Sequence, residues 1–133
     1  MATVAAFLMS CNTVLLSQKD REFLRLWWSV CWVESKCDPR ALNAKEGSVG
    51  IAQIRMICLK DCNRIIGYEK YRSDDRLDVV KSFEMFRLYV RYYAPRGTPE
   101  QWARIWNGGP QGMKKASTKA YYLKVKAAMR DKR

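Results

Sequence analysis

The chain has 133 residues and is strongly basic, with 25 lysines and arginines against 13 acidic residues. This length suits one compact domain with a single core, so residues 1–133 are expected to form a single domain. The net charge of +12 indicates an anionic partner, such as nucleic acid, lipid headgroups or bacterial wall polymers. The absence of histidine excludes Ser-His and Cys-His catalytic pairs and zinc sites that contain histidine.

The N-terminal segment, residues 1–16, is apolar but shorter than the roughly 18 residues that cross a bilayer. The sequence LMSC at 8–11 loosely resembles a lipobox, which would attach a lipid to Cys11 and mark the chain for export. No lysine or arginine precedes these apolar residues, as a signal peptide would require. A first helix packed on the core is therefore the favoured interpretation of this segment.

The first predicted helix spans residues 20–35, with Asp20 as its N-cap and with Glu34 at the end of its apolar face. Residues 38–49 could form a short hairpin, although no strand-length alternating run stands out anywhere in the chain. Residues 50–66 have helical spacing but remain ambiguous.

Three further helices are predicted in the second half of the chain. The first spans residues 77–93, with one apolar and one charged face. The next begins at Thr98, followed by a proline, and ends near Trp106 before a Gly-Gly-Pro sequence. The last is capped by Ser117 or Thr118 and runs nearly to the C-terminus. The expected fold class is therefore mainly α.

Five cysteines lie along the chain, namely Cys11, Cys31, Cys37, Cys58 and Cys62. Their odd number and irregular spacing indicate reduced thiols rather than a disulfide-stapled secreted scaffold. Cys58 and Cys62 would share one helical face, and without a second pair they are interpreted as packed thiols rather than as a metal site. No metal or cofactor is expected.

Glu34 and the loop that follows it are interpreted as one site. A carboxyl on an apolar helical face is costly to ionise, so its pKa should rise toward neutrality, and such a group can act as a general acid. Alternatively, Glu34 points to solvent or pairs with an arginine. Pro39 is expected to stop the helix, Gly47 and Gly50 permit close backbone approach, and Gln53 supplies an amide. Such a concave wall would suit a neutral, hydroxyl-rich ligand such as a sugar.

Three segments of the sequence resemble, in family order, the motifs of the soluble lytic transglycosylase family and its goose-type lysozyme relatives. They are Glu34-Ser35 followed by Asp38-Pro39 and GIAQI at 50–54, then IWNGGP at 105–110, then TKAYYLKV at 118–125. The corresponding family motifs are Glu-Ser with Asn/Asp-Pro and Gly-Leu-Met-Gln-Ile, Tyr-Asn-x-Gly-Pro, and Thr-x-x-Tyr-Val-x-Lys-Val. The resemblance covers about residues 20–128 and implies a lysozyme-like fold.

The resemblance also implies roles for individual residues. Glu34 would be the catalytic acid/base, with Tyr121 close to it. The expected substrate-binding residues are Asn43, Gln53, Trp106, Asn107 and Tyr121. Two of these depart from the family pattern. Asn43 stands where the family often has a serine, in a loop that looks one residue longer, and Trp106 replaces a tyrosine whose hydroxyl could hold the acid.

The activity implied by the resemblance is that of a lytic transglycosylase, which cleaves the MurNAc-GlcNAc bond of peptidoglycan. Glu34 would act alone and leave a 1,6-anhydro product, because the N-acetyl group and C6 hydroxyl of the substrate can replace a second carboxylate and water. One alternative is a hydrolytic lysozyme of the same fold, with Glu46 as the possible second acid. Another is a non-catalytic wall-binding module, favoured if Trp106 has disabled the site.

The expected partners are peptidoglycan strands and the anionic surface of the cell envelope. Nucleic acid is not expected, because the basic residues are spread over the whole chain and no nucleic-acid motif is present. We expect a monomer located in the bacterial envelope, in the periplasm or on the outer surface, or associated with a phage.

Overall fold

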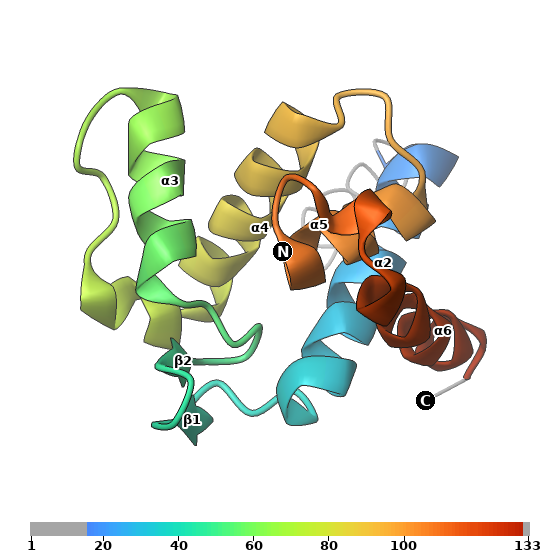
Figure 1. The fold of residues 1–133 in the computed structure, drawn as a ribbon, viewed down its shortest axis with the longest axis horizontal. Helices are drawn as coiled ribbons and strands as arrows, with labels where there is room; N and C mark the ends of the chain where they lie inside the picture. The colour runs from blue at the N-terminus through green and yellow to red at the C-terminus, as the bar shows by residue number, and fades with distance from the viewer. Residues whose placement is uncertain (1–15, 132–133) are drawn as a thin grey trace, which may run out of the picture.

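The computed structural model describes residues 16–131, which form five α-helices and a small two-stranded sheet (Figure 1). The helices are α2 (Gln18–Ser35), α3 (Met56–Ile66), α4 (Val79–Tyr93), α5 (Pro99–Gly108) and α6 (Ala116–Arg130). The antiparallel strands β1 (Leu42–Asn43) and β2 (Ser48–Val49) follow α2, and short 3-10 helices lie at Ser73–Leu77 and Gly112–Lys114.

This architecture confirms a mainly α fold with a hairpin inside residues 38–49. It also settles the ambiguous region, where the helix starts only at Met56 because the preceding residues form the turn after the hairpin. Between residues 16 and 131 no helix is long and apolar enough to cross a membrane. The expectations for the N-terminal segment, a packed helix or a lipidated Cys11, lie outside the described residues.

The start of α2 differs from the prediction. Its N-cap is Ser17, whose hydroxyl accepts a hydrogen bond from the backbone N–H of Asp20 at 3.0 Å. The Asp20 carboxylate in turn accepts from the backbone N–H of Ser17. This reciprocal pair is a capping box, in which the acidic residue occupies the third helical position. The prediction of Asp20 as N-cap is therefore wrong by one helical turn.

The start of α6 also differs from the prediction, whereas that of α5 agrees with it. Lys115 is the N-cap of α6 and provides no side-chain cap, so neither Ser117 nor Thr118 has the predicted role. The Thr118 hydroxyl is buried and accepts instead from Nε of Arg104 at 2.9 Å, an interaction that fastens α6 to α5. Thr98 caps α5 as predicted, and its hydroxyl accepts from the N–H of the third helical residue.

The core forms where the apolar faces of α2, α4 and α5 meet. The rings of Phe23 and Trp27 on α2 pack against Phe86 on α4, with centroids 5.5 and 5.3 Å apart. Burial of each such ring contributes roughly 1.5–3 kcal/mol. In addition, α6 packs on α2 and α5, and α3 packs on α4. The first turns of α2 are therefore anchored firmly, and its last turn, which contains Glu34, leads into the hairpin segment.

A buried arginine fixes the segment that joins the hairpin to α3. The Arg76 guanidinium donates to the carbonyl oxygens of Gly47 at 3.2 Å and Ile54 at 3.0 Å. Gly50 lies against the backbone of the same residue, because a Cβ on Gly50 would come within 1.8 Å of the Arg76 carbonyl oxygen. The carbonyl and guanidinium of Arg76 thus set the path of this segment along the site.

Replacing Gly50 by alanine is expected to lower the free energy of unfolding by roughly 3 kcal/mol or more. Two causes add up here, because the residue has a positive φ of 89° and because the new Cβ would overlap the backbone of Arg76. The matched control is Gly47→Ala, since Gly47 also has a positive φ, of 68°, but open space where the Cβ would lie. That control should lose only about 1–2 kcal/mol. Chemical denaturation of both variants measures the difference, and equal losses would contradict the close approach.

Candidate active site

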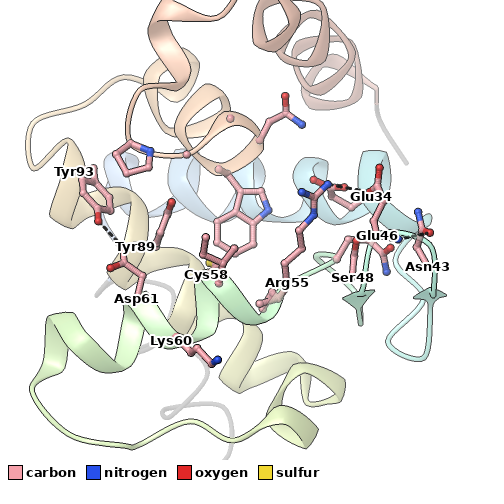
Figure 2. Close-up of a pocket in the computed structure, with 18 of the residues that line it drawn as sticks. Glu34, Asn43, Glu46, Ser48, Arg55, Cys58, Lys60, Asp61, Tyr89 and Tyr93 are labelled. Carbon is pink, nitrogen blue, oxygen red and sulfur yellow. Dashed lines mark hydrogen bonds and ion pairs between the residues drawn. The ribbon is translucent and has the colours of Figure 1, made fainter.

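A cleft of about 930 Å³ runs between the end of α2, the hairpin, α3 and the C-terminal end of α5 (Figure 2). It brings together most of the residues that were predicted to form the site, namely Glu34, Asn43, Glu46, Gln53, Trp106 and Asn107. Tyr121 reaches Glu34 from α6. Residues more than 80 positions apart in the chain therefore meet at one carboxyl group.

The Glu34 carboxyl is half-buried, and the Tyr121 hydroxyl donates a hydrogen bond to its Oε2 at 2.9 Å. Burial raises the pKa of Glu34 to about 7, because the charged form loses hydration. The hydrogen bond from Tyr121 opposes this rise, the negative charge of Glu46 adds to it, and Arg55 counteracts it slightly. A carboxyl with this pKa carries its proton at mildly acidic pH and can transfer it near neutrality.

The residue after Glu34 joins the end of the helix to the loop. The Ser35 hydroxyl donates to the Ile51 carbonyl at 2.7 Å and accepts from the backbone N–H of Asp38 at 3.0 Å. The helix itself ends at Ser35, where Lys36 adopts a left-handed conformation with φ 55°. The expected stop at Pro39 thus comes after the actual end. These bonds hold the last helical turn, and with it Glu34, against the loop.

Glu46 lies on the same side of the cleft as Glu34 and forms an ion pair with Arg55, whose Nη2 is 3.1 Å from its carboxylate (Figure 2). Both side chains are about half exposed, at 52% for Glu46 and 56% for Arg55. The Asn43 side chain accepts from the backbone N–H of Glu46 at 3.3 Å. Asn43 thereby supports the turn that carries the second carboxylate, in addition to lining the cleft.

The Gln53 amide is engaged with the protein backbone, since its NH₂ group donates to the carbonyls of Gly50 at 3.0 Å and Ala41 at 3.3 Å. Gln53 also has a positive φ of 53°, which the turn before α3 requires. The residue is therefore built into the wall of the cleft, and its contact with a glycan stays a prediction. Asn107 is exposed at the end of α5 and lines the same cleft.

Trp106 near the end of α5 lines the cleft. Its ring packs edge-on against Phe86 and Tyr89, and its Nε1 donates to the Ala52 carbonyl at 3.3 Å. The hydroxyl that a tyrosine would have supplied at this position is replaced by that of Tyr121, which holds the acid directly. The acid thus has a hydrogen-bond donor although position 106 is a tryptophan.

No protein-family model matches the chain. Among curated proteins, invertebrate-type lysozyme 6 of Caenorhabditis elegans is 31% identical over 110 residues, covering 73% of this chain and 80% of that protein. The chain belongs to the invertebrate-type lysozyme family. Among solved structures, a chain in the crystal structure of Aeromonas hydrophila PliI in complex with Meretrix lusoria lysozyme matches with a TM-score of 0.67 and 26% identity. That match covers 84% of this chain and 89% of the other.

Membership in the invertebrate-type lysozyme family confirms the expected lysozyme-like fold. It also changes the family to which the chain is assigned. The comparisons find an invertebrate-type lysozyme and not a soluble lytic transglycosylase, so the motif resemblance holds at the level of the lysozyme-like fold. The curated relative comes from a nematode, and the expected bacterial or phage origin has no support.

The far end of the cleft holds a polar cluster that the sequence did not predict. The Tyr93 hydroxyl donates to the Asp61 carboxylate, and Nε of Arg64 donates to the same carboxylate at 2.7 Å (Figure 2). Tyr93 lies 32 residues from Asp61, so only the packing of α3 on α4 brings them together. The i, i+3 spacing of Asp61 and Arg64 on α3 was the one available signal.

Cys31, Cys58 and Cys62 are free thiols, as expected, and Sγ of Cys37 donates to the Trp28 carbonyl at 3.8 Å. Cys62 is buried, and Cys58 beside it lines the cleft. Burial and the neighbouring thiol raise the pKa of Cys58, which keeps it protonated and unreactive at neutral pH. Within residues 16–131 no three histidine, cysteine, aspartate or glutamate side chains gather closely enough to hold a metal ion.

Tyr121→Phe tests the hydrogen bond to Glu34. That bond lowers the pKa of Glu34 because it favours the charged carboxylate, so its loss should raise the pKa above about 7. If Glu34 acts as the acid, activity falls as pH rises through this pKa, and the alkaline limb of the pH-rate profile should move to higher pH. Tyr122→Phe, on the same helix, is the matched control. An unchanged limb in Tyr121→Phe would contradict the assignment.

Proposed function

We propose that the chain is a hydrolytic lysozyme that cleaves the MurNAc-GlcNAc bond of peptidoglycan, with Glu34 as the general acid and Glu46 as the second carboxylate. The observation that carries this proposal is the contrast between two carboxyls in one cleft. Glu34 is half-buried with a pKa of about 7, whereas Glu46 is half-exposed and ion-paired with Arg55. Glycoside hydrolases ordinarily use two carboxyl groups, and the different surroundings of the two groups let one act as the acid and the other as the carboxylate.

The geometry supports different roles for the two carboxyl groups in the reaction. Glu34 gives its proton to the glycosidic oxygen as the bond to the leaving sugar breaks, and positive charge develops at the anomeric carbon. Glu46 is held by Arg55 and by Asn43 in the turn, and it faces this charge as a carboxylate. Water then completes the hydrolysis, and Glu34 regains its proton. Tyr121 is a positioning residue, because it acts through the carboxyl of Glu34.

Family membership supports the same proposal, since the curated relative is named a lysozyme. The lytic transglycosylase reaction would require Glu34 alone, and it leaves Glu46 without a role. The wall substrate also agrees with the basic character of the chain, because bacterial envelopes carry anionic polymers. We accordingly propose that the protein acts at the bacterial cell envelope.

Mass spectrometry of digested peptidoglycan tests this proposal directly. Hydrolysis leaves free reducing ends, whereas a transglycosylase leaves 1,6-anhydro ends that lack the mass of one water. We expect reducing ends. Fragments that carry only anhydro ends would assign the chain to the transglycosylase reaction, and binding to walls without any fragments would assign it to a non-catalytic module.

A further inference from the structure

A second groove, of about 620 Å³, lies between the N-terminal half of α2 and the C-terminal half of α6. These two helices also carry Glu34 and Tyr121; on α2 the groove uses the end opposite Glu34, and on α6 its lining begins at Tyr122, which follows Tyr121 in the sequence. Arg25 precedes Glu34 by nine residues on α2, which corresponds to roughly 13 Å along the helix. The groove is thus separate from the cleft but is attached to the same rigid pair of helices.

Four cations line this groove in two rows, Arg21 and Arg25 on α2, and Lys126 and Arg130 on α6. Each row has i, i+4 spacing, which places both side chains on one helical face about 6 Å apart along the axis. None of the four forms an ion pair with another of residues 16–131. Among residues 16–131, Glu22 is the one carboxylate in the lining, so the described part of the groove has a clear excess of positive charge.

The floor of the groove is less polar than its walls. Tyr122 and Met129 on α6 are both partly buried and line the groove together with the cations. Lys126 is also partly buried, so its aliphatic stem covers part of this floor while its ammonium group stays accessible. A ligand that fits such a groove carries regularly spaced anionic groups joined by short carbon segments. Arginine favours phosphate among such anions, because its planar fork donates two parallel hydrogen bonds.

We propose that this groove binds a phosphodiester-linked polyol chain, the kind of anionic polymer that bacterial walls carry beside peptidoglycan. The choice of polymer rests on the proposed wall function, whereas the anionic and linear character of the ligand rests on the groove itself. Packed helices lie about 8–10 Å apart, so a single flexible chain fits between their side chains better than a broad nucleic-acid duplex. A flat bilayer surface cannot follow a concave groove.

Binding in this groove would hold the protein on the wall while leaving the cleft free for the glycan. The polymer would contact the N-terminal half of α2, and the glycan would meet the C-terminal end of the same helix. Because the two ligands occupy opposite ends of α2, binding of one does not block the other.

The experiment uses the full chain with Glu34→Gln, so that no glycan is cleaved, and soluble poly(glycerol phosphate) as the probe. Calorimetry measures the affinity of this variant for poly(glycerol phosphate) across a range of salt concentrations. Adding Arg25→Gln and Lys126→Gln should weaken binding and reduce the slope of log K against log salt by about 1.4, since each lost contact with a flexible polyanion removes about 0.7. The matched control adds Arg40→Gln and Lys124→Gln, which remove the same charge outside the groove.

Equal losses in the two double variants, or no loss in the groove variant, would overturn the proposal. Tighter binding of duplex DNA or of vesicles with anionic headgroups, lost in the groove variant, would overturn the choice of polymer in favour of that partner. The probe contains no glycosidic bond, so this outcome is independent of the peptidoglycan digestion. A failed digestion with groove-dependent binding would reject the proposed hydrolysis and leave the groove assignment standing.

Discussion

Replacing Glu34 by glutamine is expected to abolish cleavage of peptidoglycan and to leave the fold intact. The substitution removes the transferable proton but keeps the size of the side chain and an oxygen that accepts from Tyr121. General acid catalysis contributes about 10²–10⁴ in rate, and the other carboxyl of the cleft that accepts from a tyrosine, Asp61, lies at its far end. Clearing of a wall suspension measures the loss, and a thermal melt reports the fold.

The pH dependence of stability gives this variant a second, independent readout. A buried carboxyl whose pKa is raised from 4.5 to about 7 stabilises the folded state fully below pH 4.5, and this stabilisation is lost as pH rises through 7. Glutamine has no charge to bury, so the variant should gain stability relative to the parent chain over this interval, by up to roughly 3 kcal/mol. Glu69→Gln is the matched control, because Glu69 is exposed. An active Glu34→Gln variant would reject the catalytic assignment.

Local periodicity was sufficient to predict the helix that presents the acid. The apolar residues of 20–35 recur at helical spacing, and the structure buries Phe23, Trp27 and Val30 while Glu34 follows on the same face. The hairpin could also be predicted from the sequence, because glycines interrupt the helical periodicity of apolar residues between two helices. Helix starts were harder to predict when a side chain had two possible partners. Threonine is a common N-cap residue, but the Thr118 hydroxyl accepts a hydrogen bond from the buried Arg104 instead of capping the helix.

Contacts between distant segments were beyond any local pattern. The bond between Tyr121 and Glu34 joins residues 87 positions apart, and only the family resemblance suggested it. The ion pair between Arg55 and Glu46 likewise depends on how the turn folds back after β1. The second groove could not be predicted from the sequence either, because its cations lie far apart in the chain and come together only when α6 packs on α2.

Our proposal of hydrolysis rather than transglycosylation rests on one such contact. The motif around Glu34 predicts an acid at the end of a helix, which a hydrolase and a transglycosylase can both use. What separates them is whether a second carboxylate faces the same bond. The position of Glu46 is set by its backbone bond to Asn43 and by its ion pair with Arg55. Neither interaction has a sequence signature, so the sequence alone left Glu46 as a candidate, and our proposal of Glu46 as the second carboxylate rests on the position of the loop in three dimensions.

Replacing Glu46 by glutamine is therefore expected to lower the rate of peptidoglycan hydrolysis by about a hundredfold or more, because an amide cannot stabilise the positive charge on the sugar as a carboxylate does. The variant should also shift the pH-rate profile. The charge of Glu46 raises the pKa of Glu34, and its removal leaves Arg55 unpaired beside the cleft. Both changes favour ionised Glu34, so the alkaline limb should move to lower pH, opposite to the shift expected for Tyr121→Phe.

The matched control is Asp38→Asn, which removes another carboxylate close to the motif. Asp38 accepts from the backbone N–H of Arg40 at 2.9 Å, and asparagine keeps an oxygen for this bond, so the control should retain activity. Rates and products are measured together for both variants. If Glu46→Gln keeps most of its activity and its fragments carry anhydro ends, Glu34 works alone and the chain is a transglycosylase. If the rate collapses while Asp38→Asn stays active and the parent chain yields reducing ends, two carboxylates carry out hydrolysis, because water can then attack only with Glu46 in place.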